Sequence, residues 1–174
     1  PAFAMEAAQQ AIAGNRWNKY PPVMGYPDLR ASSSEKFKRD NGLHYAPEEV
    51  MVSTGAKQAI MNVIISLIGP GDEVVIPAPF WVSYAEQVRF AGGTPVLVHS
   101  TLEEDYKPPV ARIAAAITPR TRLLLYSSPC NPSGSVLTQA ELEALAAVVL
   151  RWPGLMVVSD EIYEHIVFDG AHRS

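Results

Sequence analysis

The sequence predicts an α/β protein with a mostly parallel sheet and helices on both faces. Three features predict this class. Nearly half of the 174 residues are apolar, at 48%, which supplies a core. Short apolar segments alternate along the chain with longer helical segments, the pattern of strand–helix–strand units. The last short segment, Leu155–Val158, is apolar throughout, as expected of a strand that is covered on both faces.

The N-terminal part of the chain predicts two helices and a connecting loop. The first helix spans Met5–Ala13 and ends at Gly14, and the second spans Leu29–Asn41 and ends at Gly42. Glycine commonly terminates helices, which is why both ends are placed there. The loop between them, which includes Tyr20, is rich in proline, glycine and tyrosine, so it is predicted to be irregular.

Strands and helices alternate from Val50 onward. The run Val50–Val52 is the first short apolar segment, and Ser53 and Thr54 offer N-cap oxygens to a helix over Gly55–Ile68. Further strands are predicted at Glu73–Ile76, Thr94–Val98, Arg122–Ser127 and Leu155–Val158, and further helices at Trp81–Phe90, Pro109–Ile117 and Thr138–Leu150. The last of these helices begins with a Thr138–Glu141 capping box. The pattern does not give the strand order.

Composition narrows the class of protein. The net charge of -4 gives no general attraction to nucleic acid or to anionic lipid, so neither is expected as a partner. No apolar run approaches the length of a membrane span, and the N-terminus carries no signal pattern. The single cysteine, Cys130, excludes an internal disulfide framework and fits a reducing compartment. The expectation is therefore a cytoplasmic protein.

Ligands of open α/β sheets bind beyond the carboxyl ends of the strands, so the residues after each apolar segment are the candidates. After Val52, the small residues up to Lys57 open a helix whose free amides suit a phosphate, although an ordinary N-cap explains them as well. Trp81 follows the next strand and could stack on a flat ligand, although filling the core is the commoner fate of a tryptophan.

The two later strand ends carry an amide and a carboxylate. Asn131 lies between prolines, which hold an amide that both donates and accepts, and a structural turn is the alternative. Asp160 directly follows an apolar strand, where a carboxylate needs a cation or several donors; an acid pair at a helix N-terminus is the alternative. Together, the four strand ends suit a phosphorylated, flat, nitrogen-containing cofactor.

Several motifs resemble those of class I, fold-type I aminotransferases, and look closest to the bacterial aspartate aminotransferases. The matching segments are 70–76, 80–84, 128–134 and 159–164, together with the Tyr20 loop, Leu29-Arg30 and 55–59, in the same order over nearly the whole chain. The family often has Asn in place of Ser127 and Thr in place of Ser133. The resemblance implies that residues 1–30 are the N-terminal helix and interface loop of a smaller domain, and that 31–174 begin an incomplete large domain.

The resemblance also implies pyridoxal 5'-phosphate as cofactor, amino-acid and 2-oxo-acid substrates, and a homodimer. It implies the following roles, position by position. The amides of Gly55, Ala56 and Lys57 hold the cofactor phosphate, and Tyr20 reaches the phosphate of the neighbouring subunit. Trp81 stacks on the cofactor ring and borders the substrate, and Asp160 pairs with the ring nitrogen. Asn131 and Tyr163 both form hydrogen bonds with the phenolic oxygen, and Asn131 also lies near the substrate carboxylate.

The resemblance further implies a Schiff-base lysine within a Ser-x-x-Lys segment. The five lysines are Lys19, Lys36, Lys38, Lys57 and Lys107, and none lies in such a segment. We therefore expect that lysine beyond Ser174, assign no catalytic residue within the chain, and expect the chain alone to be inactive. Two alternatives stay open: another fold-type I enzyme that performs β-elimination, and an aminotransferase-like sensing domain of a transcription regulator.

Overall fold

A computed structural model describes residues 1–15 and 17–174, which divide into two compact units, Pro1–Ser53 and Thr54–Ser174. The first unit contains helices α1 (Ala2–Ala13) and α2 (Pro27–Lys36), which continues into a π-helical turn (Phe37–Asn41), and then a 3₁₀ helix (Pro47–Glu49). The predicted helix over Leu29–Asn41 is thus α-helical only in its first part. Its predicted end is confirmed, because Gly42 adopts a left-handed φ of 70°.

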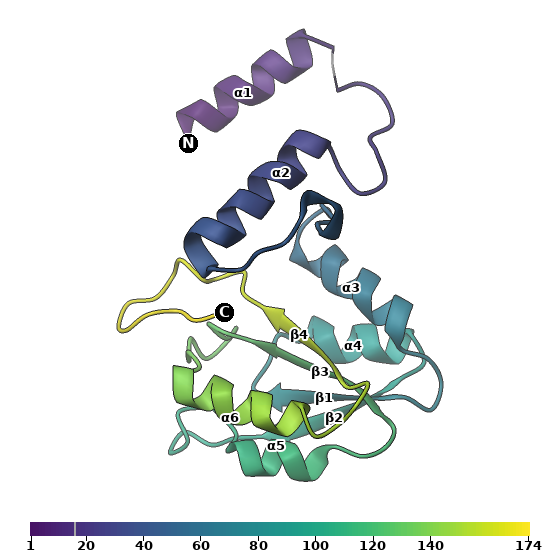
Figure 1. The fold of residues 1–174 in the computed structure, drawn as a ribbon, viewed down its shortest axis with the longest axis vertical. Coiled ribbons are helices and arrows are strands. Elements are labelled where there is room, and N and C mark those ends of the chain that lie inside the picture. Colours follow the sequence, from purple (N-terminus) through teal and green to yellow (C-terminus); the bar gives the residue numbers. More distant parts are fainter. Residues whose placement is uncertain (16) are drawn as a thin grey trace. The chain divides into compact units, whose positions relative to one another are not determined.

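The second unit is built on a four-stranded parallel sheet (Figure 1). Its elements in chain order are α3 (Ala56–Leu67), β1 (Glu73–Ala78), α4 (Ser83–Phe90), β2 (Thr94–His99), α5 (Val110–Ala116), β3 (Thr121–Ser127), α6 (Gln139–Val149) and β4 (Met156–Asp160). The strand order is β2-β1-β3-β4. The predicted α/β class with a parallel sheet is therefore confirmed.

Helices cover both faces of this sheet, as Figure 1 shows. Successive strand residues point to opposite faces, and the two buried clusters divide accordingly. Val74 and Leu123 pack with α3 and α4, whereas Val75 and Leu124 pack with α5 and α6. All four of these strand side chains are fully buried. The central strands β1 and β3 are therefore packed on both faces, and the loops that follow them extend from a buried core.

Three sequence expectations are corrected. The run Val50–Val52 is no strand; it lies in the first unit, where the amide of Val52 donates to the carbonyl of Met24, because three residues are too few to build a ladder. Helix α3 is not capped by a hydroxyl of Ser53 or Thr54; its N-cap is Gly55. Strand β4 forms one edge of the sheet, and Met156 and Val157 on it are partly exposed instead of covered.

The local signal that predicted the start of α6 is confirmed. The capping box of α6 is present, since Thr138 Oγ1 accepts from the amide of Glu141 and the Glu141 carboxylate accepts from the amide of Thr138. Such a box satisfies two amides that a helix start leaves free.

Among the residues that the structure describes, none of the helices has both the length and the apolar character needed to cross a membrane.

Candidate functional site

A cavity of about 240 Å³ lies at the carboxyl edge of the sheet in the second unit. Its lining comes from the start of α3, the loop and helix after β1, the loop after β3 and the end of β4. The lining residues are Ala56, Lys57, Trp81, Tyr84, Ser127, Asn131, Asp160, Ile162 and Tyr163. Parallel strands place their carboxyl ends at one edge, which is how segments distant in sequence meet here.

The start of helix α3 supplies free backbone amides to this cavity. Ala56 and Lys57 are the first two residues of the helix, so their amides have no acceptor one turn earlier. Gly55 before them has φ 81° and ψ 165°, a conformation that only glycine adopts readily. The side chain of Gln87 donates to the carbonyl of Lys57 over 3.0 Å and fixes this turn. Free amides and the helix dipole together favour an anion.

An aromatic pair forms one wall. The Lys57 ammonium lies 4.8 Å from the centre of the Trp81 ring, a cation–π distance. Trp81 meets Tyr84 edge to face, with ring centres 5.7 Å apart and an interplanar angle of 89°. Because the ammonium and the tyrosine both contact the indole, the Trp81 ring is held in place before any ligand arrives.

Asp160 has the donors that a carboxylate at this position requires. Tyr84 Oη donates to its Oδ2 over 2.5 Å, and the amide of Ile162 donates to its Oδ1 over 3.2 Å. Its own carbonyl accepts from the amide of Ser128 over 3.2 Å. Burial and, next, the hydrogen bond to Asp160 raise the pKa of Tyr84 far above its usual range. Tyr84 therefore stays a hydrogen-bond donor at any physiological pH, and its hydroxyl holds the Asp160 carboxylate in position at the cavity.

The loop after β3 holds Asn131 in a tight turn. The amide of Gly134 donates to the carbonyl of Cys130 over 2.7 Å, and the amide of Cys130 donates to the carbonyl of Ser135 over 2.9 Å. Within the part of the chain that the structure describes, the side chains of Asn131 and Tyr163 make no hydrogen bond, although both line the cavity. Two fixed polar groups thus face the cavity with their bonding capacity unused.

The cavity brings together six of the eight residues that the sequence singled out as site residues: Ala56, Lys57, Trp81, Asn131, Asp160 and Tyr163. Gly55 precedes this lining as the N-cap of α3. Tyr20 belongs to the other compact unit. Sequence reasoning missed Tyr84, Ser127 and Ile162 as lining residues. The position of Tyr84, three residues after Trp81, was the available signal for it, and in the structure its amide donates to the carbonyl of Trp81 over 3.0 Å.

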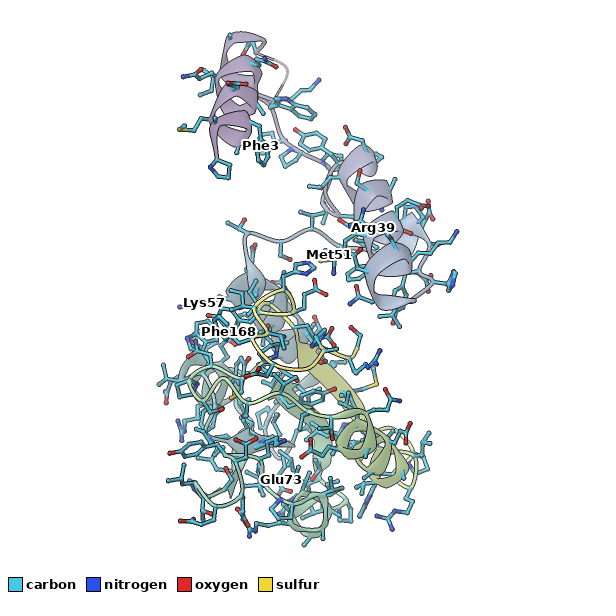
Figure 2. The ribbon with its side chains drawn as sticks, turned by 90° about the vertical axis from the view of Figure 1, so that its left-hand side faces the viewer. Phe3, Arg39, Met51, Lys57, Glu73 and Phe168 are labelled. Atoms are coloured by element: carbon cyan, nitrogen blue, oxygen red, sulfur yellow. The ribbon has the colours of Figure 1, made fainter. Side chains whose placement is uncertain are left out.

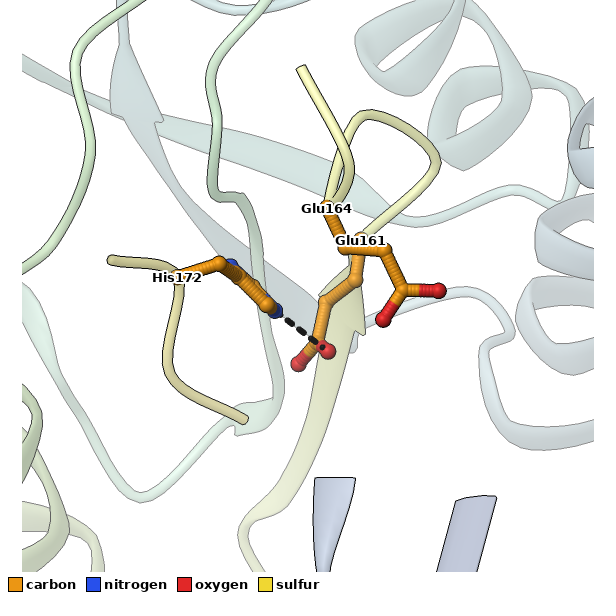
Figure 3. Close-up of side chains that lie close together, drawn as sticks. All are labelled: Glu161, Glu164 and His172. Atoms are coloured by element: carbon orange, nitrogen blue, oxygen red, sulfur yellow. Dashed lines mark hydrogen bonds and ion pairs between the residues drawn. The ribbon is translucent and has the colours of Figure 1, made fainter. Parts of the chain in front are cut away.

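A histidine and two glutamates gather just after β4 (Figure 3). His172 and Glu161 lie 2.9 Å apart (Nε2 to Oε2), and Glu161 also accepts from Ser159 and Ser174. Glu164 lies close enough that one ligand atom from each of the three lies within 4.8 Å of the others. With three partners on one carboxylate, the arrangement ties the segment around His172 to the end of β4.

Comparison with known proteins identifies the family. The family model for aminotransferase class I and II matches residues 1–173. An aspartate/prephenate aminotransferase of Cereibacter sphaeroides is 48% identical over 163 residues, which cover 94% of this chain and 40% of that protein. One of Thermus thermophilus is 47% identical over 174 residues, covering 100% of this chain and 45% of that protein. The chain thus spans less than half the length of these relatives.

Solved structures agree with the sequences. The aspartate aminotransferase of Thermus thermophilus with maleate superimposes with a TM-score of 0.96 at 46% identity, over 100% of this chain and 45% of that one. The aromatic aminotransferase of Pyrococcus horikoshii superimposes with a TM-score of 0.95 at 39% identity, again over 100% of this chain and 46% of that one. With sequence, fold and motif order in agreement, the chain belongs to the class I and II aminotransferase family.

Proposed function

We propose that this chain is the cofactor-holding part of a pyridoxal 5'-phosphate-dependent aminotransferase. The proposed reaction moves an amino group between an amino acid, aspartate or a similar one, and a 2-oxo acid. Relatives named aspartate/prephenate aminotransferases support this substrate class. The observation that carries the proposal is the single cavity that collects Ala56, Lys57, Trp81, Asn131, Asp160 and Tyr163.

The donors and acceptors around this cavity fit the proposed cofactor. The free amides at the start of α3, with Gly55 in a conformation that leaves the turn open, suit its phosphate. The Asp160 carboxylate, fixed by Tyr84, suits its ring nitrogen. Asn131 and Tyr163 have unused hydrogen-bonding capacity for its phenolic oxygen.

The chain's own residues then have distinct tasks. When bound, the cofactor supplies an electron-withdrawing ring that takes up electrons as the α-proton of an amino acid leaves. Asp160 keeps a proton on the ring nitrogen, because an ion pair in a half-buried site favours the charged partner. Trp81 covers the ring and fixes its plane, and Asn131 orients it and borders the substrate. Holding these groups in advance removes part of the entropic cost of reaching the reactive geometry.

No lysine of this chain is proposed as the catalytic lysine. The Lys57 ammonium lies over the Trp81 ring, and we propose that Lys57 acts through its backbone amide. We propose that the catalytic lysine lies in the full-length protein outside this chain, so that the chain alone does not transfer amino groups. We also propose a cytoplasmic homodimer in which Tyr20 reaches the neighbouring subunit's phosphate, with residues 1–30 belonging to a smaller domain.

The test uses the full-length protein and the variant Asp160→Ala. Breaking a paired, half-buried charge costs roughly 3 kcal/mol, so the variant should bind pyridoxal phosphate about 100-fold more weakly. Absorbance titration with the cofactor measures this affinity, and the exposed Asp169→Asn is the matched control. Unchanged affinity in Asp160→Ala would overturn the cofactor site.

The reaction is tested separately with aspartate and 2-oxoglutarate. Appearance of glutamate at the rate at which aspartate disappears supports amino transfer. Absence of glutamate, together with release of ammonia from an amino acid that carries a leaving group on its β-carbon, such as cysteine or serine, would overturn it in favour of elimination. An upstream DNA-binding domain with no turnover would favour the regulator. Each outcome leaves the affinity measurement interpretable on its own.

A further inference from the structure

A second cavity, of about 110 Å³, lies in the same unit as the cofactor cavity. The loop before α5, the loop after β3 and the side of α6 enclose it. Most of its wall is apolar or aromatic, from Phe80, Tyr106, Val110, Tyr126, Leu137 and Leu145. Four prolines, at positions 77, 79, 108 and 109, also line it, and their fixed φ angles make these walls stiff. The chemistry proposed above uses none of these groups.

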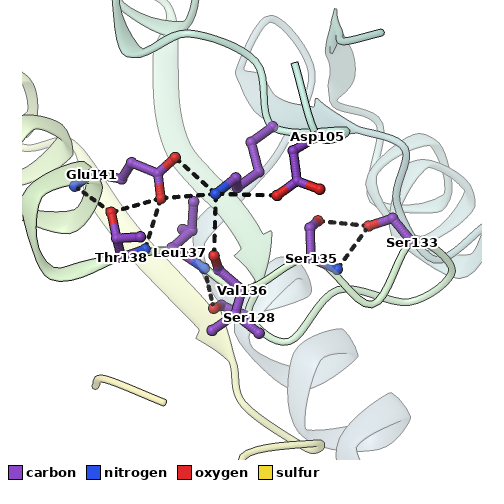
Figure 4. A network of polar contacts seen from close by, with 9 residues as sticks. Asp105, Ser128, Ser133, Ser135, Val136, Leu137, Thr138 and Glu141 are labelled. Carbon is purple, nitrogen blue, oxygen red and sulfur yellow. Dashed lines mark hydrogen bonds and ion pairs between the residues drawn. The ribbon is translucent and has the colours of Figure 1, made fainter. Parts of the chain in front are cut away.

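The charged groups at this cavity already compensate one another. Lys107 Nζ lies 3.0 Å from Glu141 Oε1 and 3.4 Å from Asp105 Oδ2, and it also donates to the carbonyl of Val136. Figure 4 shows Glu141 also anchored by Thr138, at the start of α6. The ammonium therefore has no unmet need for an anion. Because a charged ligand would lose its hydration without gaining a counterion, the cavity favours a neutral one.

One polar group in the wall has unused bonding capacity. The hydroxyl of Ser127 is buried beside the hydroxyl of Tyr84, whose pKa it lowers, and its oxygen accepts no hydrogen bond among the residues that the structure describes. A ligand hydroxyl that donates to this oxygen would add one net hydrogen bond. Ser127 lines both cavities, so this hydroxyl is the polar group they share.

We propose that this second cavity is a binding site for a small, neutral molecule with one aromatic ring and one hydroxyl group. The ring would lie among Phe80, Tyr126 and Leu145, and its hydroxyl would bond Ser127. The cavity is smaller than an apolar protein cavity of about 150 Å³ that holds benzene, so its volume limits the ligand to a single ring. A second fused ring does not fit within about 110 Å³.

The test titrates phenol and benzene into the full-length protein and detects binding by calorimetry and by saturation-transfer NMR. Both should bind saturably, and benzoate should bind more weakly than phenol because of its charge. Ser127→Ala should weaken phenol about five- to tenfold, the worth of one hydrogen bond, and leave benzene unchanged. Ser133→Ala is the matched control, because Ser133 does not line this cavity.

A filling variant gives the second measurement. Val110→Phe places a ring in the cavity and should abolish binding of both probes, with thermal unfolding confirming that the variant is folded. The absence of saturable phenol binding to the wild-type protein would overturn the proposal. Equal losses of phenol and benzene in Ser127→Ala, or unchanged binding in a folded Val110→Phe, would overturn it as well. None of these measurements needs the cofactor, so failure here leaves the proposed function standing.

Discussion

The two edges of the parallel sheet differ in how far the protein satisfies the hydrogen-bonding capacity of their polar side chains. At the amino edge, Glu73 Oε1 accepts two hydrogen bonds from Arg120, at 2.9 and 2.6 Å, and its Oε2 accepts one from Thr118 at 2.6 Å. At the carboxyl edge, Asn131 and Ser127 face cavities with unused bonding capacity. Figure 2 shows Glu73 and Lys57 at opposite ends of this unit.

This difference indicates that one edge of the sheet contributes mainly to the stability of the fold and the other mainly to ligand binding. A carboxylate whose oxygens are satisfied by the protein has nothing left for a ligand, so the amino edge holds the fold together. An edge that keeps amides, hydroxyls and a side-chain amide open loses some stability and gains a place for a ligand. Substitutions at the amino edge should therefore change unfolding, and those at the carboxyl edge should change affinity.

The largest expected effect is on stability, from Glu73→Ala. This change removes a buried carboxylate and its charge-assisted hydrogen bonds, which should lower the free energy of unfolding by about 2–3 kcal/mol. Urea unfolding measures it, with the exposed Glu143→Ala as control. Affinity for pyridoxal phosphate should stay unchanged. A parallel fall in affinity would contradict the separation of the two edges.

Tyr84→Phe tests the opposite edge. Losing a hydrogen bond to a charged group should weaken cofactor binding roughly tenfold, because Asp160 is no longer held by a second donor. The matched control is Tyr126→Phe, which removes the hydroxyl of another tyrosine. Burial raises the pKa of Tyr126 as well, but Tyr126 does not line the proposed cofactor cavity. Equal losses in the two variants would mean that Tyr84 acts through packing alone.

Two glycines sharpen the comparison further. Gly55 and Gly154 have φ of 81° and 90°, and an added methyl group would meet no atom within 4 Å at either position. Alanine at each should therefore cost only backbone strain, about 1 kcal/mol of unfolding free energy. Gly55→Ala should also weaken binding of pyridoxal phosphate, whereas Gly154→Ala, in the turn before β4, should not. Equal affinities would argue against a phosphate at the start of α3.

The sequence predicted the parts of this molecule that depend on local pattern. The apolar segments gave β1, β2 and β3, and the Thr138–Glu141 box gave the start of α6, because both signals lie within a few neighbouring residues. Part of the cavity lining followed from one topological rule, that ligands bind where parallel strands end: Trp81, Asn131 and Asp160 lie at the ends of β1, β3 and β4, whereas the start of α3 follows no strand.

What escaped prediction depends on contacts between distant residues. The pairing of Tyr84 with Asp160 joins positions 76 apart in the chain, and no spacing rule identifies it. The apolar run of β4 predicted a strand but not its place at a sheet edge, since strand order is a tertiary property. The run Val50–Val52 looked like a strand, but only pairing with another chain segment makes one.

The smallest expected effect is a dependence of stability on pH from the amino edge. The hydrogen bonds from Thr118 and then Arg120 lower the pKa of Glu73 below its ordinary value of 4.5. A lowered folded-state pKa means that the unfolded chain binds the proton first, so this stabilisation is complete above pH 4.5 and is lost as the pH falls through the folded-state pKa. The variant Glu73→Gln carries no titratable group at this position. Unfolding free energies measured at about pH 6 and about pH 3.5 should therefore differ less in this variant than in the wild type. If the two proteins lost stability in parallel, other carboxylates would carry the acid sensitivity, and the satisfied amino edge would hold by packing rather than by charge.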